Sequence, residues 1–214
     1  MVLYPINLHL AECPVLVVGG GQVAERKINT LVAAKAAITV ISPELTPGLQ
    51  VLVKSGTIRW CQRTFVAGDT EPFFLVFCTA NRREVNQNVA REARERGKLV
   101  NVADGPEEGN FSLPAQVRRG DLLLTVSTGG QSPALVRKLR RELAERYGPE
   151  YGALLLLLGR IREEMKEHFA TSRERELFWR SALTDEVLDD LRSGNLKEAE
   201  ERIRHAASGI GTQP

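Results

Sequence analysis

The chain has 214 residues, of which 43% are hydrophobic and 26% are charged, enough apolar material for a folded domain with a smaller second part. Its 29 basic and 27 acidic residues leave a formal net charge of +2, which gives no reason to expect binding to nucleic acid or to an anionic membrane. The first residues lack the features of a secretory signal, and the three cysteines form no CxxC pair. We therefore expect a cytoplasmic globular protein with reduced thiols and no membrane span.

Short apolar runs rich in β-branched residues recur along the first half of the chain. They read PVLVVG, AITVIS, TIRWCQ, FFLVFCTA and KLVNVAD, with amphipathic stretches between them, and a sixth run, DLLLTVST, follows later. Such alternation is typical of a parallel sheet, and continuously apolar strands are typical of a sheet that is covered on both faces. We predict an α/β fold with a doubly wound parallel sheet over roughly residues 13–114.

After Pro133 the sequence contains no strand-like run and predicts four helical segments. One helical face over residues 151–169 carries Leu154, Leu158, Ile161, Met165 and Phe169. Leu155 and Leu156 point elsewhere, so this helix is apolar on two sides and needs two partners. The second partner is either a second copy of the chain or another helix of the same chain, and we predict a homodimer.

The stretch VLVVGGGQVAERK joins the first apolar run to a helical pattern through three glycines. Gly19, Gly21 and Ala24 match the G-x-G-x-x-G/A pattern that binds a dinucleotide in a Rossmann-like fold. The first glycine allows the tight turn, the second lets the main chain approach the pyrophosphate, and the small third residue lets helix and strand pack closely. The alternative is a glycine turn that serves packing alone.

The end of the second run bears on the choice of cofactor. An acidic residue about 20 positions after the glycines usually binds the ribose hydroxyls of NAD. Here the run ends VISPEL, in which Ser42 can hydrogen-bond and Glu44 lies two residues further on. Because no arginine follows directly to hold the 2′-phosphate of NADP, we favour NAD.

Asp104 follows the fifth apolar run, and in open α/β sheets the ligand crevice lies outside the carboxyl ends of the strands. The position favours a carboxylate near the reacting end of a dinucleotide, while the composition of ADGP is equally that of a simple turn. The three histidines are scattered without ligand spacing, so we expect no metal held by protein side chains.

A second candidate ligand loop reads STGGQSP and precedes a helix that Pro133 can start. Its hydroxyls, its backbone amides and the basic residues nearby can bind an anion. The residues in question are Ser127, Thr128, Gly129, Gly130, Ser132, Arg118, Arg119, Arg137, Lys138, Arg140 and Arg141. A basic helix face is often merely solvated, but the loop beside it favours a polyanionic ligand.

Several segments together resemble those of one family. They read YPINL, VVGGGQVAERK, TVISPEL, NVAD, RRGDLLLTVSTGGQSPALVRKLRREL and FATSRERELFW, and they cover nearly the whole chain. The chain resembles the precorrin-2 dehydrogenase/sirohydrochlorin ferrochelatase family, which includes the N-terminal half of bifunctional sirohaem synthases. Within this set, VSTGGQSPAL is much more specific than the glycine bend.

The resemblance implies an NAD-dependent oxidation of the tetrapyrrole precorrin-2 to sirohydrochlorin by a homodimer. It leaves open whether the protein then inserts ferrous iron, as a substrate, to give sirohaem. By similarity, Gly21, Gln22 and Val23 contact the cofactor phosphates, Pro43 and Glu44 contact the adenosine end, Asp104 is the catalytic aspartate and Thr128 lines the tetrapyrrole pocket. One departure is Lys35, which stands where many relatives have glycine at the end of the first helix.

We expect three parts: an NAD-binding Rossmann-like domain (1–114), a dimerisation and substrate-cleft segment (115–150) and a helical C-terminal domain (151–214). Two rival hypotheses are a non-catalytic NAD-sensing module that acts through a protein partner and a reductase for a smaller substrate. The sensing module requires the glycine bend but neither Asp104 nor the second loop. The reductase predicts a tighter pocket with fewer cations.

Overall fold

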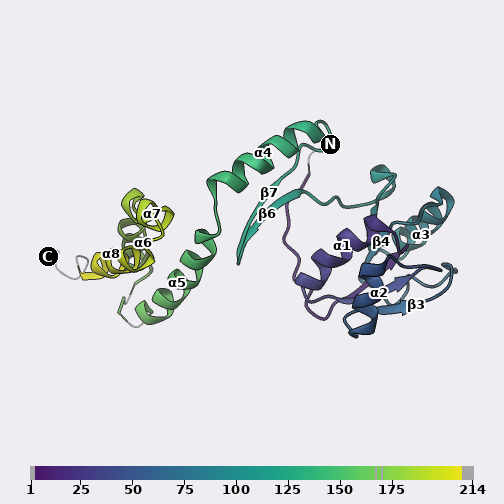
Figure 1. Cartoon of the computed structure of the whole chain (residues 1–214), viewed down its shortest axis with the longest axis horizontal. Helices are drawn as coiled ribbons and strands as arrows, with labels where there is room; N and C mark the ends of the chain where they lie inside the picture. The colour runs from purple at the N-terminus through teal and green to yellow at the C-terminus, as the bar shows by residue number, and fades with distance from the viewer. Residues whose placement is uncertain (1–2, 167, 170, 209–214) are drawn as a thin grey trace. The chain divides into compact units, whose positions relative to one another are not determined.

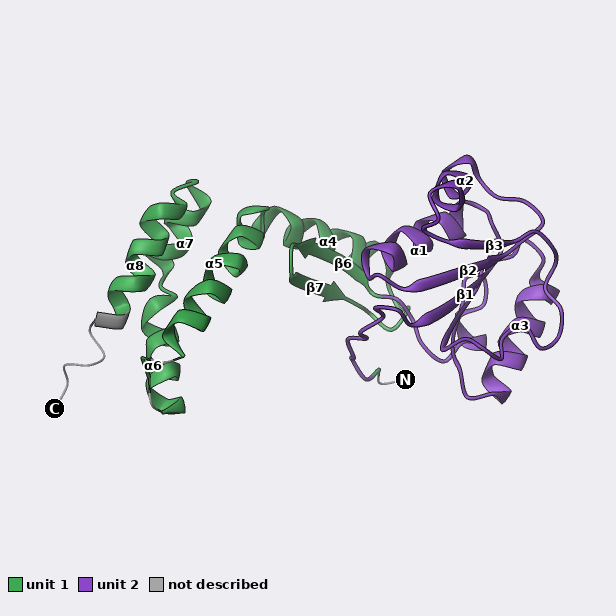
Figure 2. Ribbon diagram, turned by 90° about the horizontal axis from the view of Figure 1, so that it is seen from below, with its two compact units in different colours: residues 1–3, 114–214 green, residues 4–113 purple. Residues whose placement is uncertain are grey.

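The structure, a computed structural model, describes residues 3–166, 168–169 and 171–208. The chain divides into two compact units, one of Tyr4–Leu113 and one of Pro114–Pro214 with the first three residues, shown in separate colours in Figure 2. None of the helices in the described ranges combines the length and the apolar character of a membrane span.

The first unit is built on a five-stranded sheet in the order β3-β2-β1-β4-β5, with every neighbouring pair parallel. The strands are β1 (Pro14–Val18), β2 (Ala37–Ile41), β3 (Arg59–Cys61), β4 (Leu75–Cys78) and β5 (Leu99–Val102). From β1 the chain continues to β2 and β3 on one side of β1, and it then crosses to β4 and β5 on the other side. The direction of strand addition therefore reverses between β1 and β4. In sheets of this kind a ligand binds at the carboxyl ends of the two strands where the direction reverses. The predicted Rossmann-like, doubly wound sheet is confirmed.

Helices cover both faces of this sheet, as Figures 1 and 2 show. Helices α1 (Gln22–Ala33) and α2 (Pro47–Lys54) share one hydrophobic core with alternate strand residues, and α3 (Arg83–Glu95) shares the other. On β1, Val15 and Val17 enter the first core while Leu16 and Val18 enter the second. This is why the strand is apolar without alternation.

The connection from β3 to β4 is not the amphipathic stretch that we expected. It consists of turns, held by an Arg63–Asp69 ion pair of 2.6 Å and by the carboxylate of Glu92 on α3. Glu92 accepts hydrogen bonds from the Gly68 amide (2.9 Å), the Thr70 amide (3.0 Å) and the Thr70 hydroxyl (2.5 Å). In this connection, hydrogen bonds and an ion pair from side chains thus take the place of the backbone hydrogen bonds of a helix.

Glu92 makes the stability of the first unit depend on pH. Burial raises the pKa of its carboxyl, but the hydrogen bonds from Thr70 and Gly68 and the charge of Arg96 outweigh burial and lower it overall. Since the folded pKa lies below the unfolded one, the contribution is complete above the ordinary glutamate range and is lost as pH falls through the folded pKa. We expect Glu92→Gln to cost about 2 kcal/mol of unfolding free energy at neutral pH. Urea titration of this variant and of the exposed Glu95→Gln measures it, and equal stabilities at neutral pH would contradict it.

The first helix ends on a residue that is strained there. Lys35 adopts φ 57°, and its amide donates to the Val32 carbonyl while the next amide donates to the Leu31 carbonyl. Helix α3 ends with the same pair of bonds, but there the left-handed residue is Gly97, at φ 67°. A side chain in this region costs roughly 1–2 kcal/mol, partly offset because glycine loses more entropy on folding.

We therefore expect Lys35→Gly to raise the unfolding free energy by about 0.5–1 kcal/mol. The reverse change at the matching position, Gly97→Lys, should lower it by a similar amount, and Lys35→Ala should change little because alanine suffers the same strain. Thermal unfolding of the three variants checks this. A glycine at position 35 that stabilises no more than alanine would show that the strain at φ 57° is relieved elsewhere.

The second unit begins with a two-stranded antiparallel sheet, β6 (Ala115–Arg119) and β7 (Leu122–Val126). The described helices are α4 (Pro133–Arg146), α5 (Glu150–Met165), α6 (Ser172–Ala182), α7 (Asp185–Arg192) and α8 (Leu196–Ser208). The sixth apolar run is β7, whereas β6 was not predicted, because AQVRR is too polar to indicate a strand. The prediction of four helical segments was wrong, because Gly194, at φ 81°, ends α7 and separates it from α8.

Helix α5 packs into a core formed by α5 to α8. Leu154, Leu157 and Ile161 are buried there, while Leu158 and Met165 pack at its edge. The helix ends at Met165, so Phe169 reaches the same core from the following turn. Leu156 is 68% exposed, which leaves an apolar side chain on the opposite face, as the sequence predicted.

Candidate functional site

The glycine turn between β1 and α1 is dictated partly by packing. Gly19 has φ 115°, and a Cβ there would lie 2.5 Å from the Thr79 carbonyl oxygen at the end of β4. A Cβ on Gly20 would overlap the Glu44 carbonyl and lie 2.7 Å from the Leu45 side chain. Any side chain at either position would push the turn away from β4 or from the segment after β2.

Gly21 is different, because no atom lies within 4 Å of the place where its Cβ would be and its φ is −86°. It is the N-cap of α1 and provides no side-chain cap, so the amides of Gln22 and Val23 begin the helix next to open space. Free amides and the helix dipole at such a position favour an anion. Packing therefore explains the first two glycines, whereas it gives no reason for the third, which stands beside open space at a helix N-terminus.

The segment after β2 forms one wall of this turn. Ser42 is buried, and its hydroxyl donates to the Glu44 carbonyl at 2.7 Å, while the Thr46 amide donates to the Gly20 carbonyl at 3.0 Å. The side chains of Pro43 and Glu44 are exposed. Ser42 thus shapes the turn and presents the two residues that the resemblance assigns to the adenosine end.

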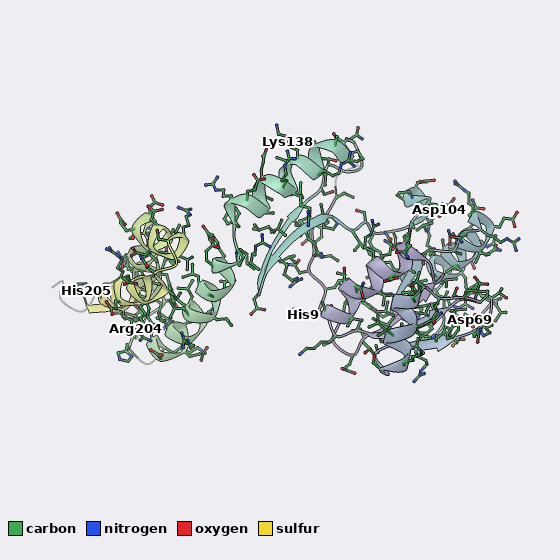
Figure 3. The ribbon with its side chains drawn as sticks, viewed as in Figure 1. His9, Asp69, Asp104, Lys138, Arg204 and His205 are labelled. Carbon is green, nitrogen blue, oxygen red and sulfur yellow. The ribbon has the colours of Figure 1, made fainter. Side chains whose placement is uncertain are left out.

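Asp104 lies two residues beyond β5, next to α3, and its side chain is exposed (Figure 3). Its Oδ1 accepts a hydrogen bond of 2.8 Å from Nδ2 of Asn86, a buried side chain on α3. The other oxygen has no protein donor among the described residues. The acid is therefore held on one side and open on the other, which suits a group that exchanges a proton with a ligand.

The thiol of Cys78 lies at the end of β4. Burial, together with the negative charges of Asp104 and Glu108, raises its pKa to about 12. Cys78 is therefore a neutral core residue and not a nucleophile.

Among the described residues, no three His, Cys, Asp or Glu side chains are grouped as metal ligands.

The second candidate loop, residues 127–132, is ordered by its own hydroxyls. Thr128 Oγ1 accepts from the Ser132 amide at 3.1 Å, Ser127 Oγ accepts from the Gly129 amide at 3.3 Å, and Ser132 caps α4 through the Leu135 amide at 3.2 Å. Gly129 and Gly130 have positive φ, and no atoms lie within 4 Å of their would-be Cβ positions. Each hydroxyl still has its proton to donate, so the loop retains donors for an anionic group.

The basic residues near this loop differ in what they do. Arg119 donates to the carbonyls of Tyr147 (2.9 Å) and Ala144 (3.0 Å), so it caps the C-terminus of α4. Arg140 donates a hydrogen bond to the Gln116 carbonyl. Lys138, which projects from α4 in Figure 3, forms an ion pair with Glu142, and Arg141 forms one with Glu145. Arg118 and Arg137 are exposed and form no ion pair within the described part of the chain. These two are the arginines best placed for an external anion.

The sequence did not identify the residues that position this site, Thr79 and Asn86. Asn86 had a signal, since it lies in phase with Val89, Ala90 and Ala93 on the buried face of α3. A polar side chain on a buried, apolar helix face needs hydrogen-bond partners. These partners show which part of the structure the residue holds in place.

Three family models match the chain. One described as "Putative NAD(P)-binding" matches residues 6–115, one described as "Sirohaem biosynthesis protein central" matches 119–146, and one described as "Sirohaem synthase dimerisation region" matches 150–206.

Individual proteins match over nearly the whole chain. The sirohaem synthase of Methylobacillus flagellatus is 37% identical over 97% of this chain and 44% of its own length. Sirohaem synthase 1 of Aeromonas salmonicida is 39% identical over 86% of this chain and 39% of its own length, so the chain spans less than half of these relatives. A solved structure titled "SirC, precorrin-2 dehydrogenase" is 28% identical with a TM-score of 0.77, covering 96% of this chain and 100% of that one. With the NAD(P)-binding model over its first half and the sirohaem models over most of its second, the chain belongs to the family of precorrin-2 dehydrogenases and sirohaem synthases that its motifs resemble.

Proposed function

We propose that this chain catalyses the NAD-dependent dehydrogenation of precorrin-2 to sirohydrochlorin in sirohaem biosynthesis. The observation that carries the proposal is the likeness to a precorrin-2 dehydrogenase over the full length of that protein. The site agrees with it, because an open glycine turn and a carboxylate with a free oxygen lie in one unit. The rival hypothesis of a non-catalytic NAD-sensing module is not supported, because the similar proteins are named as synthases and as a dehydrogenase.

The residues of the chain have separate tasks in this reaction. The amides of Gln22 and Val23 hold the pyrophosphate, and Gly21 leaves room for it. When bound, NAD supplies the hydride acceptor. Asp104 takes the proton that precorrin-2 loses together with the hydride, and it returns that proton to water after the product leaves. The balanced reaction turns precorrin-2 and NAD⁺ into sirohydrochlorin, NADH and a proton.

The proposed cofactor is NAD and not NADP. Glu44 is exposed after β2, and no arginine lies beside it from Ser42 to Gly48. A carboxylate at this position binds ribose hydroxyls and repels a 2′-phosphate. Pro43 fixes the approach of the main chain to the adenosine end.

The proposed substrate is a polycarboxylate, and we assign its binding to Arg118, Arg137 and the Ser127–Gly130 loop, with Thr128 lining the pocket. Arg118→Gln and Arg137→Gln should each raise the KM for precorrin-2 about 2- to 5-fold, the size expected for exposed ion pairs, and added salt should raise the wild-type KM. Arg141→Gln is the control, because Arg141 is already paired with Glu145 at 4.0 Å. A KM that is insensitive to salt would remove the cationic surface from substrate binding.

The proposed assembly is a homodimer formed through the second unit. The match to a dimerisation region, the 68% exposed Leu156 and a sheet of only two strands all support it. Light scattering of the purified protein tests it, and a monomer at micromolar concentration would overturn it.

The proposed activity is tested by mixing protein, precorrin-2 and NAD in one cuvette and measuring the formation of sirohydrochlorin and NADH. The proposal requires sirohydrochlorin and NADH to appear together in equal amounts, with slower turnover when NADP replaces NAD. No sirohydrochlorin from folded protein would refute the proposed function. Because the curated relatives are named sirohaem synthases, ferrous iron is then added to the product, and faster formation of sirohaem than in a protein-free control would establish iron insertion as well.

A further inference from the structure

Both polar atoms of the Asn86 side chain have hydrogen-bond partners. It is 1% exposed, its Oδ1 accepts from the Ala80 amide at 2.9 Å, and its Nδ2 donates to the Ala80 carbonyl at 2.9 Å and to Asp104 Oδ1 at 2.8 Å. The orientation of the amide follows from these partners. An amide N–H must meet an oxygen and a carbonyl must meet a donor, so Ala80 forces the NH2 group toward Asp104.

Ala80 is also part of the wall of the glycine turn. Its amide nitrogen would lie 2.8 Å from a Cβ on Gly19, and the preceding residue, Thr79, donates both its amide and its hydroxyl to the Val18 carbonyl, at 2.8 Å and 2.9 Å. A continuous path of close contacts therefore runs from Gly19 through Ala80 and Asn86 to Asp104. The buried members of this path cannot shift without leaving polar groups unsatisfied.

We propose that Asn86 is a positioning residue that fixes Asp104 relative to the dinucleotide turn, and this inference rests on the proposed function. Asn86 is covered and does not reach substrate or cofactor. It binds Oδ1 of the carboxylate and leaves Oδ2 free, so that one oxygen anchors the acid while the other meets the substrate. Without this bond an exposed aspartate in a loop samples several rotamers, and few of them are productive.

The test combines two variants with a matched control. Asn86→Ala removes all three bonds, whereas Asn86→Asp keeps the size and the acceptor for the Ala80 amide but places a carboxylate against Asp104. Asn88→Ala is the control, because Asn88 lies on the same helix and is exposed. We expect both Asn86 variants to lower kcat about 10- to 100-fold with little change in the KM for precorrin-2, and the control to lower neither.

A double-mutant cycle separates positioning from a general loss of structure. Combined with Asp104→Ala, the Asn86 change should lower kcat no further, since the group that it positions is gone. An equal loss in both backgrounds, or the same loss in Asn88→Ala, would overturn the proposal. Circular dichroism spectra and melting curves establish which variants fold, and Asn86→Asp serves if Asn86→Ala does not.

A second readout does not depend on turnover. Side-chain NMR couplings of Asp104 in the free protein should report one χ1 rotamer in the wild type and averaging in the Asn86 variants. If the wild type formed no sirohydrochlorin, the proposed function would fail, yet this measurement would still decide whether Asn86 orders Asp104. A single rotamer in wild type and variants alike would overturn the positioning role.

Discussion

Asp104→Asn is expected to lower the turnover of precorrin-2 about 10²- to 10⁴-fold, the range over which a general base contributes to catalysis. The asparagine keeps the shape of the side chain and can still accept the bond from Asn86 Nδ2, so the fold and the binding of both ligands should be preserved. The loss should therefore appear in kcat and leave KM nearly unchanged. Steady-state kinetics with matched melting temperatures measure it.

Glu107→Gln is the matched control for this change. Glu107 lies three residues further along the chain, in the short 3-10 helix Pro106–Glu108, is exposed, and forms an ion pair with Arg83 at 3.7 Å. Its neutralisation should leave turnover within about twofold, as for most exposed pairs. Unchanged turnover in Asp104→Asn would exclude this carboxylate as the base.

Gly21→Val is expected to weaken NAD binding by about 100-fold or more while the protein stays folded. The φ of −86° is available to valine and no atom lies within 4 Å of the new Cβ, so the fold should be kept, with a small loss of stability because valine is a poor N-cap residue. The branched side chain would occupy the space of the pyrophosphate and cost about two charge-assisted hydrogen bonds, each about 1.5–3 kcal/mol. Isothermal titration with NAD measures the loss.

The first glycine provides the contrasting control. Gly19→Val should destabilise the fold itself, because φ is 115° and the new Cβ would lie 2.5 Å from a backbone carbonyl oxygen. The two variants thus separate a glycine that the protein requires from a glycine that its ligand requires. Normal NAD affinity in Gly21→Val would mean that the dinucleotide binds elsewhere.

The main sheet and its helices were predictable because their signals are local. Continuously apolar runs indicated strands covered on both faces, and Ala24, Ile28 and Leu31 have the helical spacing that the core of α1 uses. Strand β6 was missed because its polar residues pair only with β7, a tertiary event that no single-strand pattern reports. The break between α7 and α8 depends on one glycine, which a helix can also contain.

The candidate site was predictable in part. The glycine pattern indicated which amides begin α1, but only the structure separates Gly19 and Gly20, where a Cβ would clash, from Gly21, which faces open space. Arg119 looked like a substrate contact, because sequence cannot show that its guanidinium caps α4. The bond between Asn86 and Asp104 joins residues 18 positions apart on different elements, a pairing that composition and periodicity do not encode.

In the proposed reaction, the dinucleotide turn and Asp104 act on one substrate at the carboxyl edge of the sheet. A crystal structure of the protein with NAD tests it most directly. We predict the pyrophosphate on the amides of Gln22 and Val23 and the nicotinamide ring facing the free oxygen of Asp104, with space between them for one flat ring system. A nicotinamide bound on another face of the unit, or an Asp104 turned away from it, would contradict the account.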